Sequence, residues 1–345
     1  MQRVNLFEIG FIAISLTVLA LLLAGSVLWI QWWRGRGKRN LCGDVSPELI
    51  TRLPQPRPRW TVFDFLLMFG IMILVGASLQ QSLPTPQQET DQTPPSAAVV
   101  EQAVDAPPDD TSPDDTSPDD TSPDDAPAED APPAEDSSDR AAKLRSQVRI
   151  HFIANLTAFV LTLIFLRLTQ GATLAHLSLV PHRNDFRRGL FATVWILAPV
   201  LLLNLLVSNL VQYEHTVTNL LAEASGTRTF LALLVSAACL TPIVEEFQFR
   251  LLLQGGLQQI ADPPPDSDAM SFWKPSTAWP IYVTSLLFAA MHWGQGAAPI
   301  PLFFLSVGLG FLYQRTGRLV PAIVVHMLLN AATLCMEFCR VNAGL

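Results

Sequence analysis

Two adjacent glutamates and an arginine lie in one of the most apolar stretches of the sequence, CLTPIVEEFQFRLLLQGG (239–256). Ionisable side chains at membrane depth are costly, so Glu245, Glu246 and Arg250 mark a candidate functional site. In a helix, Glu246 and Arg250 share one face and can form an ion pair. Glu245 is rotated by about 100° from Glu246. We therefore expect a supporting ion pair between Glu246 and Arg250. Glu245 has no local partner and is expected either to be protonated or to face a polar cavity.

Two histidines and an asparagine occur in later apolar segments. His292 lies in SLLFAAMHWG, and His326 and Asn330 are four residues apart in PAIVVHMLLNAA. Taken singly, each has a structural explanation, as an interfacial histidine or as a hydrogen bond between helices. Together with Glu245 they supply an acid–base set and donors for an oxyanion. Their convergence from separate apolar helices favours catalysis.

The elements that must position these residues are transmembrane helices. Half of the 345 residues are hydrophobic and 15% are charged, which is too apolar for an ordinary soluble domain. Several runs reach the roughly 20 apolar residues that span a bilayer. We therefore predict an all-helical, polytopic membrane protein with about eight spans. The predicted spans are residues 9–33, 60–79, 150–168, 190–213, 228–256, 278–294, 299–314 and 319–338.

An acidic segment, residues 81–139, separates the second and third spans and contains the tandem unit DDTSP. It is rich in Pro, Asp and Ser and poor in large apolar residues, which predicts a disordered, extended linker. The predicted domains are a two-helix N-terminal membrane anchor (1–80), this linker (81–139) and a six-helix domain (140–345).

The distribution of basic residues predicts the orientation in the membrane. The loop 34–59 carries seven Lys and Arg residues, so we expect it to be cytoplasmic and the acidic linker to be extracytoplasmic, in a multi-pass protein of the plasma (inner) membrane. The basic cluster at 140–149 opposes this orientation. The basic segment 176–189 is expected to lie along the inner membrane surface. No nucleic-acid partner is predicted, because no binding fold surrounds that segment.

Three spaced motifs on successive apolar helices resemble those of the CPBP family, which includes the CAAX prenyl endopeptidases of the second type and bacterial proteins linked to bacteriocin processing and self-immunity. The motifs are Glu245-Glu246-x-x-x-Arg250, Phe288-x-x-x-His292 and His326-x-x-x-Asn330. The resemblance covers roughly residues 228–335. The two N-terminal spans, the acidic linker and the proline-rich loop DPPPDSD lie outside the family pattern.

The resemblance implies an intramembrane endopeptidase without a serine or cysteine nucleophile. Carried over to this sequence, Glu245 and His292 activate water, while His326 and Asn330 stabilise the oxyanion. Glu246 and Arg250 remain the supporting pair. The implied substrate is a membrane-associated or prenylated peptide, in contact with membrane lipid, and no cofactor is implied.

Three alternatives remain open at this stage. A zinc metalloprotease would use Glu245, His292 and His326 as ligands, although the sequence has neither HExxH nor a CxxC pair. A proton-coupled transporter would use the same buried groups, although no inverted repeat of broken helices is evident. A non-catalytic immunity or scaffold protein would need none of them for chemistry.

Overall fold

The computed structural model describes residues 5–40, 50, 53, 55, 58–82, 137–209, 216–263 and 273–345. The regular elements that these residues form are all helices, beside one isolated antiparallel bridge between Gln55 and Trp273, so the predicted all-α class is confirmed. The elements in chain order are α1 (Leu6–Asn40), α2 (Val62–Gln81), α3 (Ser137–Gln170), α4 (Arg183–Ser208), α5 (Thr216–Glu223), α6 (Thr227–Leu233), η1 (Leu234–Leu240), α7 (Thr241–Glu246), η2 (Phe247–Gln254), α8 (Gly255–Ala261), α9 (Trp279–Ala290), α10 (Pro299–Thr316) and α11 (Leu319–Ala343).

In the described part of the chain, six helices are long and apolar enough to cross a membrane. They are α1, α2, α3, α4, the run from α6 to α8, and α11. The other two predicted spans, 278–294 and 299–314, correspond to α9 and α10, which are not among the six. The count of eight spans therefore stays a prediction.

The acidic linker lies almost wholly outside the described residues. Helix α2 ends at Gln81 and α3 begins at Ser137, so only the two edges of the predicted segment 81–139 are described. The proline-rich loop and the loop 34–59, which is predicted to be cytoplasmic, also fall largely outside the described part. The predicted disorder and sidedness of these segments stay predictions.

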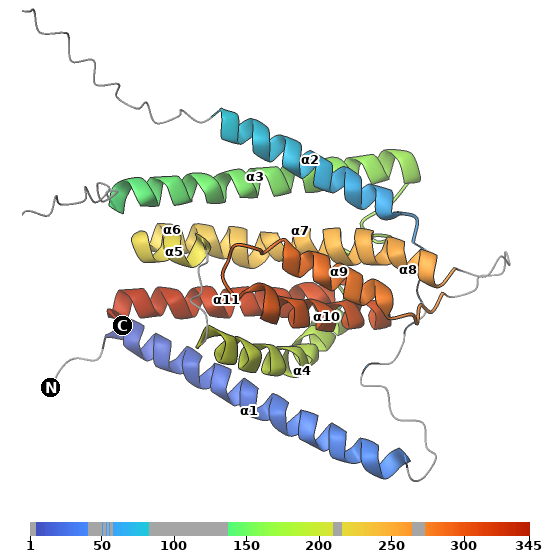
Figure 1. Cartoon of the computed structure of the whole chain (residues 1–345), viewed down its shortest axis with the longest axis horizontal. Helices are drawn as coiled ribbons and strands as arrows, with labels where there is room; N and C mark the ends of the chain where they lie inside the picture. Colours follow the sequence, from blue (N-terminus) through green and yellow to red (C-terminus); the bar gives the residue numbers. More distant parts are fainter. Residues whose placement is uncertain are drawn as a thin grey trace, which may run out of the picture.

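The two N-terminal helices lie on opposite sides of the bundle (Figure 1). Helix α1 packs against α4 and α11, whereas α2 packs against α3, η2 and α8. Gly25 of α1 permits the close approach to α4, because a Cβ there would lie only 2.6 Å from the carbonyl oxygen of Val194. The indole nitrogen of Trp29 also donates to the carbonyl of Trp195 at 2.9 Å. Each N-terminal helix therefore has its own interface with the C-terminal helices.

One continuous helical run, from α6 to α8, carries the glutamate pair and contains two π-helical segments, η1 and η2. These segments directly precede and directly follow α7, the short α-helix that contains both glutamates. Pro242 lies near the junction of η1 and α7, where its missing N–H interrupts the regular backbone ladder. π-Helical insertions are rare and frequently occur at functional sites. The apolar sequence predicted a continuous helix over 228–256, and neither π-helical segment was predicted.

Helices α9 and α10 form a hairpin beside this run (Figure 1). Helix α9 has 12 residues and rises about 18 Å, which is less than the roughly 30 Å of a hydrocarbon core. The chain turns back after α9 at Gly294 and Gly296, which have φ values of 95° and 61° and so suit the left-handed turn. Figure 1 shows this turn between the two ends of α11. The second motif thus reaches the interior of the bundle on a short helix.

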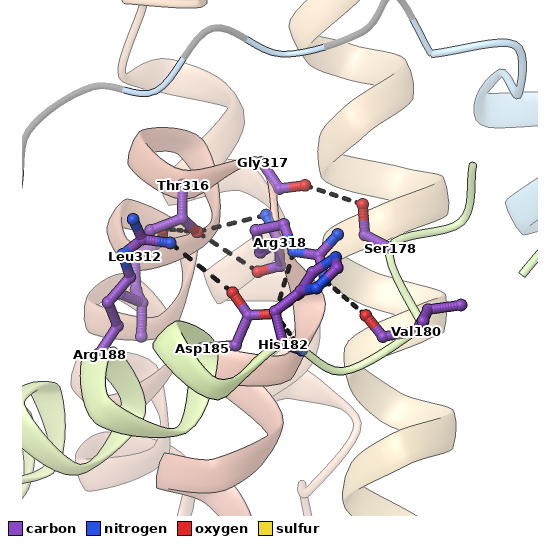
Figure 2. Close-up of polar contacts among 9 residues, drawn as sticks. All are labelled: Ser178, Val180, His182, Asp185, Arg188, Leu312, Thr316, Gly317 and Arg318. Carbon is purple, nitrogen blue, oxygen red and sulfur yellow. Dashed lines mark hydrogen bonds and ion pairs between the residues drawn. The ribbon is translucent and has the colours of Figure 1, made fainter. Parts of the chain in front are cut away.

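A cluster at one end of the bundle fixes the start of α11, the helix with the third motif (Figure 2). The guanidinium of Arg318 donates to Asp185 on α4 at 3.1 Å from Nε and 2.7 Å from Nη2, and Nη2 also donates to the carbonyl of Val180. Next to it, the hydroxyl of Ser178 donates to the carbonyl of Gly317 at 2.9 Å. The Asp185 side chain is 2% exposed, so the pair with Arg318 is shielded from solvent screening on one side. These contacts hold the first turns of α4 and α11 together.

Asp262 closes the loop between α8 and α9. Its carboxylate accepts hydrogen bonds from the backbone amides of Ser276 and Thr277, both at 2.9 Å, from the Thr277 hydroxyl at 2.7 Å and from the Gln258 amide at 2.6 Å. Its own carbonyl accepts from the indole nitrogen of Trp273 at 2.8 Å. Both ends of the proline-rich loop are therefore joined at one residue.

We expect Asp262→Asn to destabilise the folded protein in a pH-dependent way. Burial raises the pKa of this carboxyl, but hydrogen bonds from Thr277, Ser276 and Gln258 outweigh it and lower the pKa from 3.8 to about 2. The charged form therefore stabilises the fold fully above pH 3.8, and this contribution is lost as the pH falls towards about 2. Thermal unfolding in detergent should show a lower midpoint for the variant at neutral pH. The difference from wild type should shrink between pH 3.8 and 2, and a constant difference would contradict the prediction.

Candidate active site

The predicted ion pair between Glu246 and Arg250 is present. Nε of Arg250 lies 3.0 Å from Oε2 of Glu246, and both side chains are fully buried. A buried charge pair needs further hydrogen bonds to offset desolvation. Arg250 has one, from Nη2 to the hydroxyl of Ser306 on α10 at 2.9 Å. The pair is thus fixed between the α7–η2 junction and α10.

His326 lies between the two glutamates. Its Nδ1 is 2.9 Å from Oε1 of Glu246, and its Nε2 is 3.7 Å from Oε2 of Glu245. An ionised carboxylate can only accept a hydrogen bond, so Nδ1 carries the proton and donates the hydrogen bond to Glu246. This contact orients the ring with Nε2 towards Glu245. As expected, Glu245 has no ion-pair partner on its own helix among the described residues. It does have a neighbour on another helix, His326 of α11, which was not expected.

The two glutamates differ in access. The Glu246 side chain is fully buried and already holds Arg250 and His326, whereas the Glu245 side chain is 17% exposed. Apart from the contact of 3.7 Å with His326, Glu245 has no ion pair with another described residue. Glu245 is therefore the member of the pair that can reach a reactant, as the helical rotation had indicated.

Asn330 lies one turn beyond His326 on α11 and is half-buried. Its side-chain nitrogen donates to the carbonyl of Ala237, in η1, at 3.0 Å. A carboxamide has two N–H groups, so this contact fixes the side chain and leaves a second donor. The π-helical segment η1 thus supplies the acceptor that orients Asn330.

His292 belongs to the same region through an aromatic contact. Helix α9 ends at Ala290, so His292 lies in the turn that follows rather than in the helix predicted over 278–294. Its Nδ1 lies 2.9 Å from the carbonyl of Phe288, which can only accept, so Nδ1 is the donor and Nε2 takes no part in this contact. The Phe288 ring lies 5.0 Å from the His292 ring and 6.0 Å from that of His326, centroid to centroid. No hydrogen bond or ion pair joins His292 directly to Glu245, both of which the structure describes.

Residues 227–332 match the family model described as Type II CAAX prenyl endopeptidase Rce1-like. This segment belongs to that family. The Rce1-like domain begins with α6 and extends into α11, which agrees with the predicted extent of the resemblance, 228–335. It contains all six predicted site residues, and the family is one of membrane proteases. Comparisons with curated proteins and with solved structures gave no match.

Sequence reasoning missed Ser306 as a partner of the Rce1-like site. It lies in PLFFLSVGLGF, where a hydroxyl in an apolar helix was a readable signal. Its side chain is fully buried and hydrogen-bonded to Arg250. Phe288 was noted as part of the second motif, but its position under the Arg250 guanidinium, 5.5 Å from Cζ to the ring centroid, was not predicted.

The zinc alternative requires Glu245, His292 and His326 to converge on one ion. Among the described residues of the Rce1-like domain, and of the described chain as a whole, no group of three or more His, Cys, Asp or Glu side chains is arranged to hold a metal. The Nδ1 atoms of both histidines are engaged by Glu246 and by the Phe288 carbonyl, respectively. The described side chains therefore do not form the three-ligand set that this alternative requires.

Proposed function

We propose that this protein is an intramembrane endopeptidase that hydrolyses a peptide bond in a membrane-associated or prenylated substrate with directly activated water. The observation that carries the proposal is the grouping of Glu245, Glu246 and His326 within hydrogen-bond or ion-pair distance inside an apolar bundle. Membership of residues 227–332 in a family of membrane proteases supports it.

In this mechanism Glu245 and His292 activate the water. Glu245 accepts a proton as the water oxygen bonds to the substrate carbonyl carbon, and the proton later passes to the leaving nitrogen as the C–N bond breaks. His292 keeps Nε2 available for the same water or for the returning proton, because Nδ1 is engaged by a backbone carbonyl.

His326 and Asn330 are proposed to stabilise the tetrahedral oxyanion. In its doubly protonated form, His326 donates from Nδ1 to Glu246 and from Nε2 towards the developing charge. Asn330 has a second N–H besides the one that it gives to Ala237. Both side chains are held before substrate binds, which is the preorganisation that makes such donors effective.

The position of the site inside an apolar helical bundle suits a substrate that is itself in the membrane. We propose that the basic loops face the cytoplasm, that the protein resides in the plasma (inner) membrane, and that membrane lipid surrounds the bundle. The start of α1 and the end of α11 lie at the same end of the bundle (Figure 1), which is consistent with an even number of spans.

Mass spectrometry of membrane peptides tests the proposed function. Cells that produce the wild-type chain should contain cleaved fragments of one or a few membrane peptides, and cells that produce Glu245→Gln should accumulate the intact forms. Glu223→Gln, an exposed glutamate on α5, is the matched control and should resemble wild type. Identical peptide profiles for wild type and Glu245→Gln would contradict proteolysis.

A further inference from the structure

A chain of polar contacts runs from the candidate catalytic glutamate into α10, a helix that carries none of the three motifs. Starting from α10, the hydroxyl of Ser306 accepts from Nη2 of Arg250 at 2.9 Å, and Nε of Arg250 donates to Glu246 at 3.0 Å. Glu246 accepts from Nδ1 of His326 at 2.9 Å, and Nε2 of that ring lies 3.7 Å from Glu245. Every member except Glu245 is buried, so the chain opens only at its catalytic end.

The Ser306 hydroxyl is the second anchor of the guanidinium. Arg250 contacts Glu246 through Nε alone rather than through the two-pronged arrangement that fixes a guanidinium plane. Nη1 has no hydrogen-bond partner among the described residues, so Nη2 and Ser306 provide the remaining directional contact. The plane so fixed also faces the Phe288 ring. Without Ser306, Arg250 can rotate about its bond to Glu246.

Two further contacts hold α10 in register with η2 and α8. Gln254 donates to the carbonyl of Gly310 at 2.9 Å, and Gln314 donates to the side-chain oxygen of Gln258 at 3.1 Å. Each contact joins residues 56 positions apart, as does the one between Arg250 and Ser306. Gly310 permits this approach, because a Cβ there would lie 3.0 Å from Oε1 of Gln254. The backbone of α10 thus places the hydroxyl at a fixed height beside the site.

We propose that Ser306 is a positioning residue for this active site. It fixes the Arg250 guanidinium, the guanidinium fixes Glu246, and Glu246 sets the orientation and the protonated nitrogen of His326. The link from Ser306 to His326 concerns the protein without substrate. The effect of Ser306 on turnover rests on the proposed function.

Nitrogen NMR of the full chain in detergent micelles, labelled with ¹⁵N only in histidine, tests the first part without any substrate. The Nδ1 and Nε2 shifts report which ring nitrogen is protonated, and His326→Ala identifies the His326 signals by their loss. Ser306→Ala should shift these signals. Ser285→Ala is the matched control, because Ser285 on α9 is equally buried and its hydroxyl has no hydrogen-bond partner among the described residues. Unchanged His326 signals in Ser306→Ala would overturn the proposal.

Kinetics test the second part. With a membrane peptide substrate, Ser306→Ala should lower kcat by about 10-fold and change KM by less than about twofold, because the lost hydrogen bond involves a charged group and does not contact substrate. Ser285→Ala should match wild type, and Ser306→Thr, which keeps the hydroxyl, should recover most of the kcat. Full activity in Ser306→Ala would overturn the catalytic part. A wild-type chain without protease activity whose His326 signals still respond to Ser306→Ala would overturn the proposed function and leave the positioning role intact.

Discussion

Replacing Glu245 with glutamine is expected to reduce proteolysis to background while leaving the fold intact. Glutamine keeps the size and much of the hydrogen bonding of glutamate but cannot take a proton from water. General acid–base groups contribute about 10²–10⁴-fold to turnover, and the upper end is expected for the group that activates the nucleophile. Among the described residues, the contact of 3.7 Å with His326 is the one ion pair of Glu245, so its replacement should change the unfolding temperature little. The measurement is cleavage of a fluorogenic membrane peptide by purified protein in detergent, together with thermal unfolding.

The neighbouring glutamate provides the contrast. Glu246→Gln removes the charge that compensates Arg250 in a fully buried site, and it also weakens the contact with His326. It should therefore lower the free energy of unfolding by about 3–5 kcal/mol, the usual cost of leaving one charge of a buried ion pair uncompensated. If Glu246→Gln were inactive yet as stable as wild type, while Glu245→Gln stayed active, the roles of the two glutamates would be reversed.

Local geometry explains how much of the site the sequence could predict. The pairing of Glu246 with Arg250 depends only on a spacing of four in one helix, and the structure contains it. The contact between Glu245 and His326 joins elements about 80 residues apart, and no periodicity within either helix encodes it. The hydroxyl of Ser306 was visible as a polar residue in an apolar helix, but its partner was not.

In the fold, too, features set by local sequence were predictable and features set by contacts between helices were not. Apolar runs predicted helices because a spanning segment must satisfy its backbone internally. The two π-helical segments around α7 were not predictable, because they depend on how neighbouring helices accommodate a displaced backbone ladder. The early end of α9 was also missed, since hydropathy extends through Met291 whereas the glycine turn that ends the helix depends on φ values above zero. These two departures lie next to the first and second motifs.

The largest remaining effect on kcat is expected when a proposed oxyanion donor is lost. The same variants distinguish directly activated water from zinc chemistry. His326→Ala and Asn330→Ala should each lower kcat by about 10²–10³-fold, the usual cost of one lost oxyanion donor. KM should change little, because these donors matter most when charge develops in the transition state. His326→Ala should cost more of the two, since it also removes the hydrogen-bonding partner of Glu246 at 2.9 Å.

A zinc enzyme would respond differently to the same variants. His326→Ala would lose the metal, Asn330→Ala would have little effect, and a chelator would stop the reaction until metal returned. We expect activity to survive exhaustive chelation, because no three His, Cys, Asp or Glu side chains among the described residues are grouped so that they could hold a metal ion. Metal analysis of the purified wild type and both variants, together with the fluorogenic assay, distinguishes the glutamate–histidine mechanism from the zinc mechanism. Stoichiometric zinc that disappears in His326→Ala would refute the glutamate–histidine mechanism and establish the metal-dependent one.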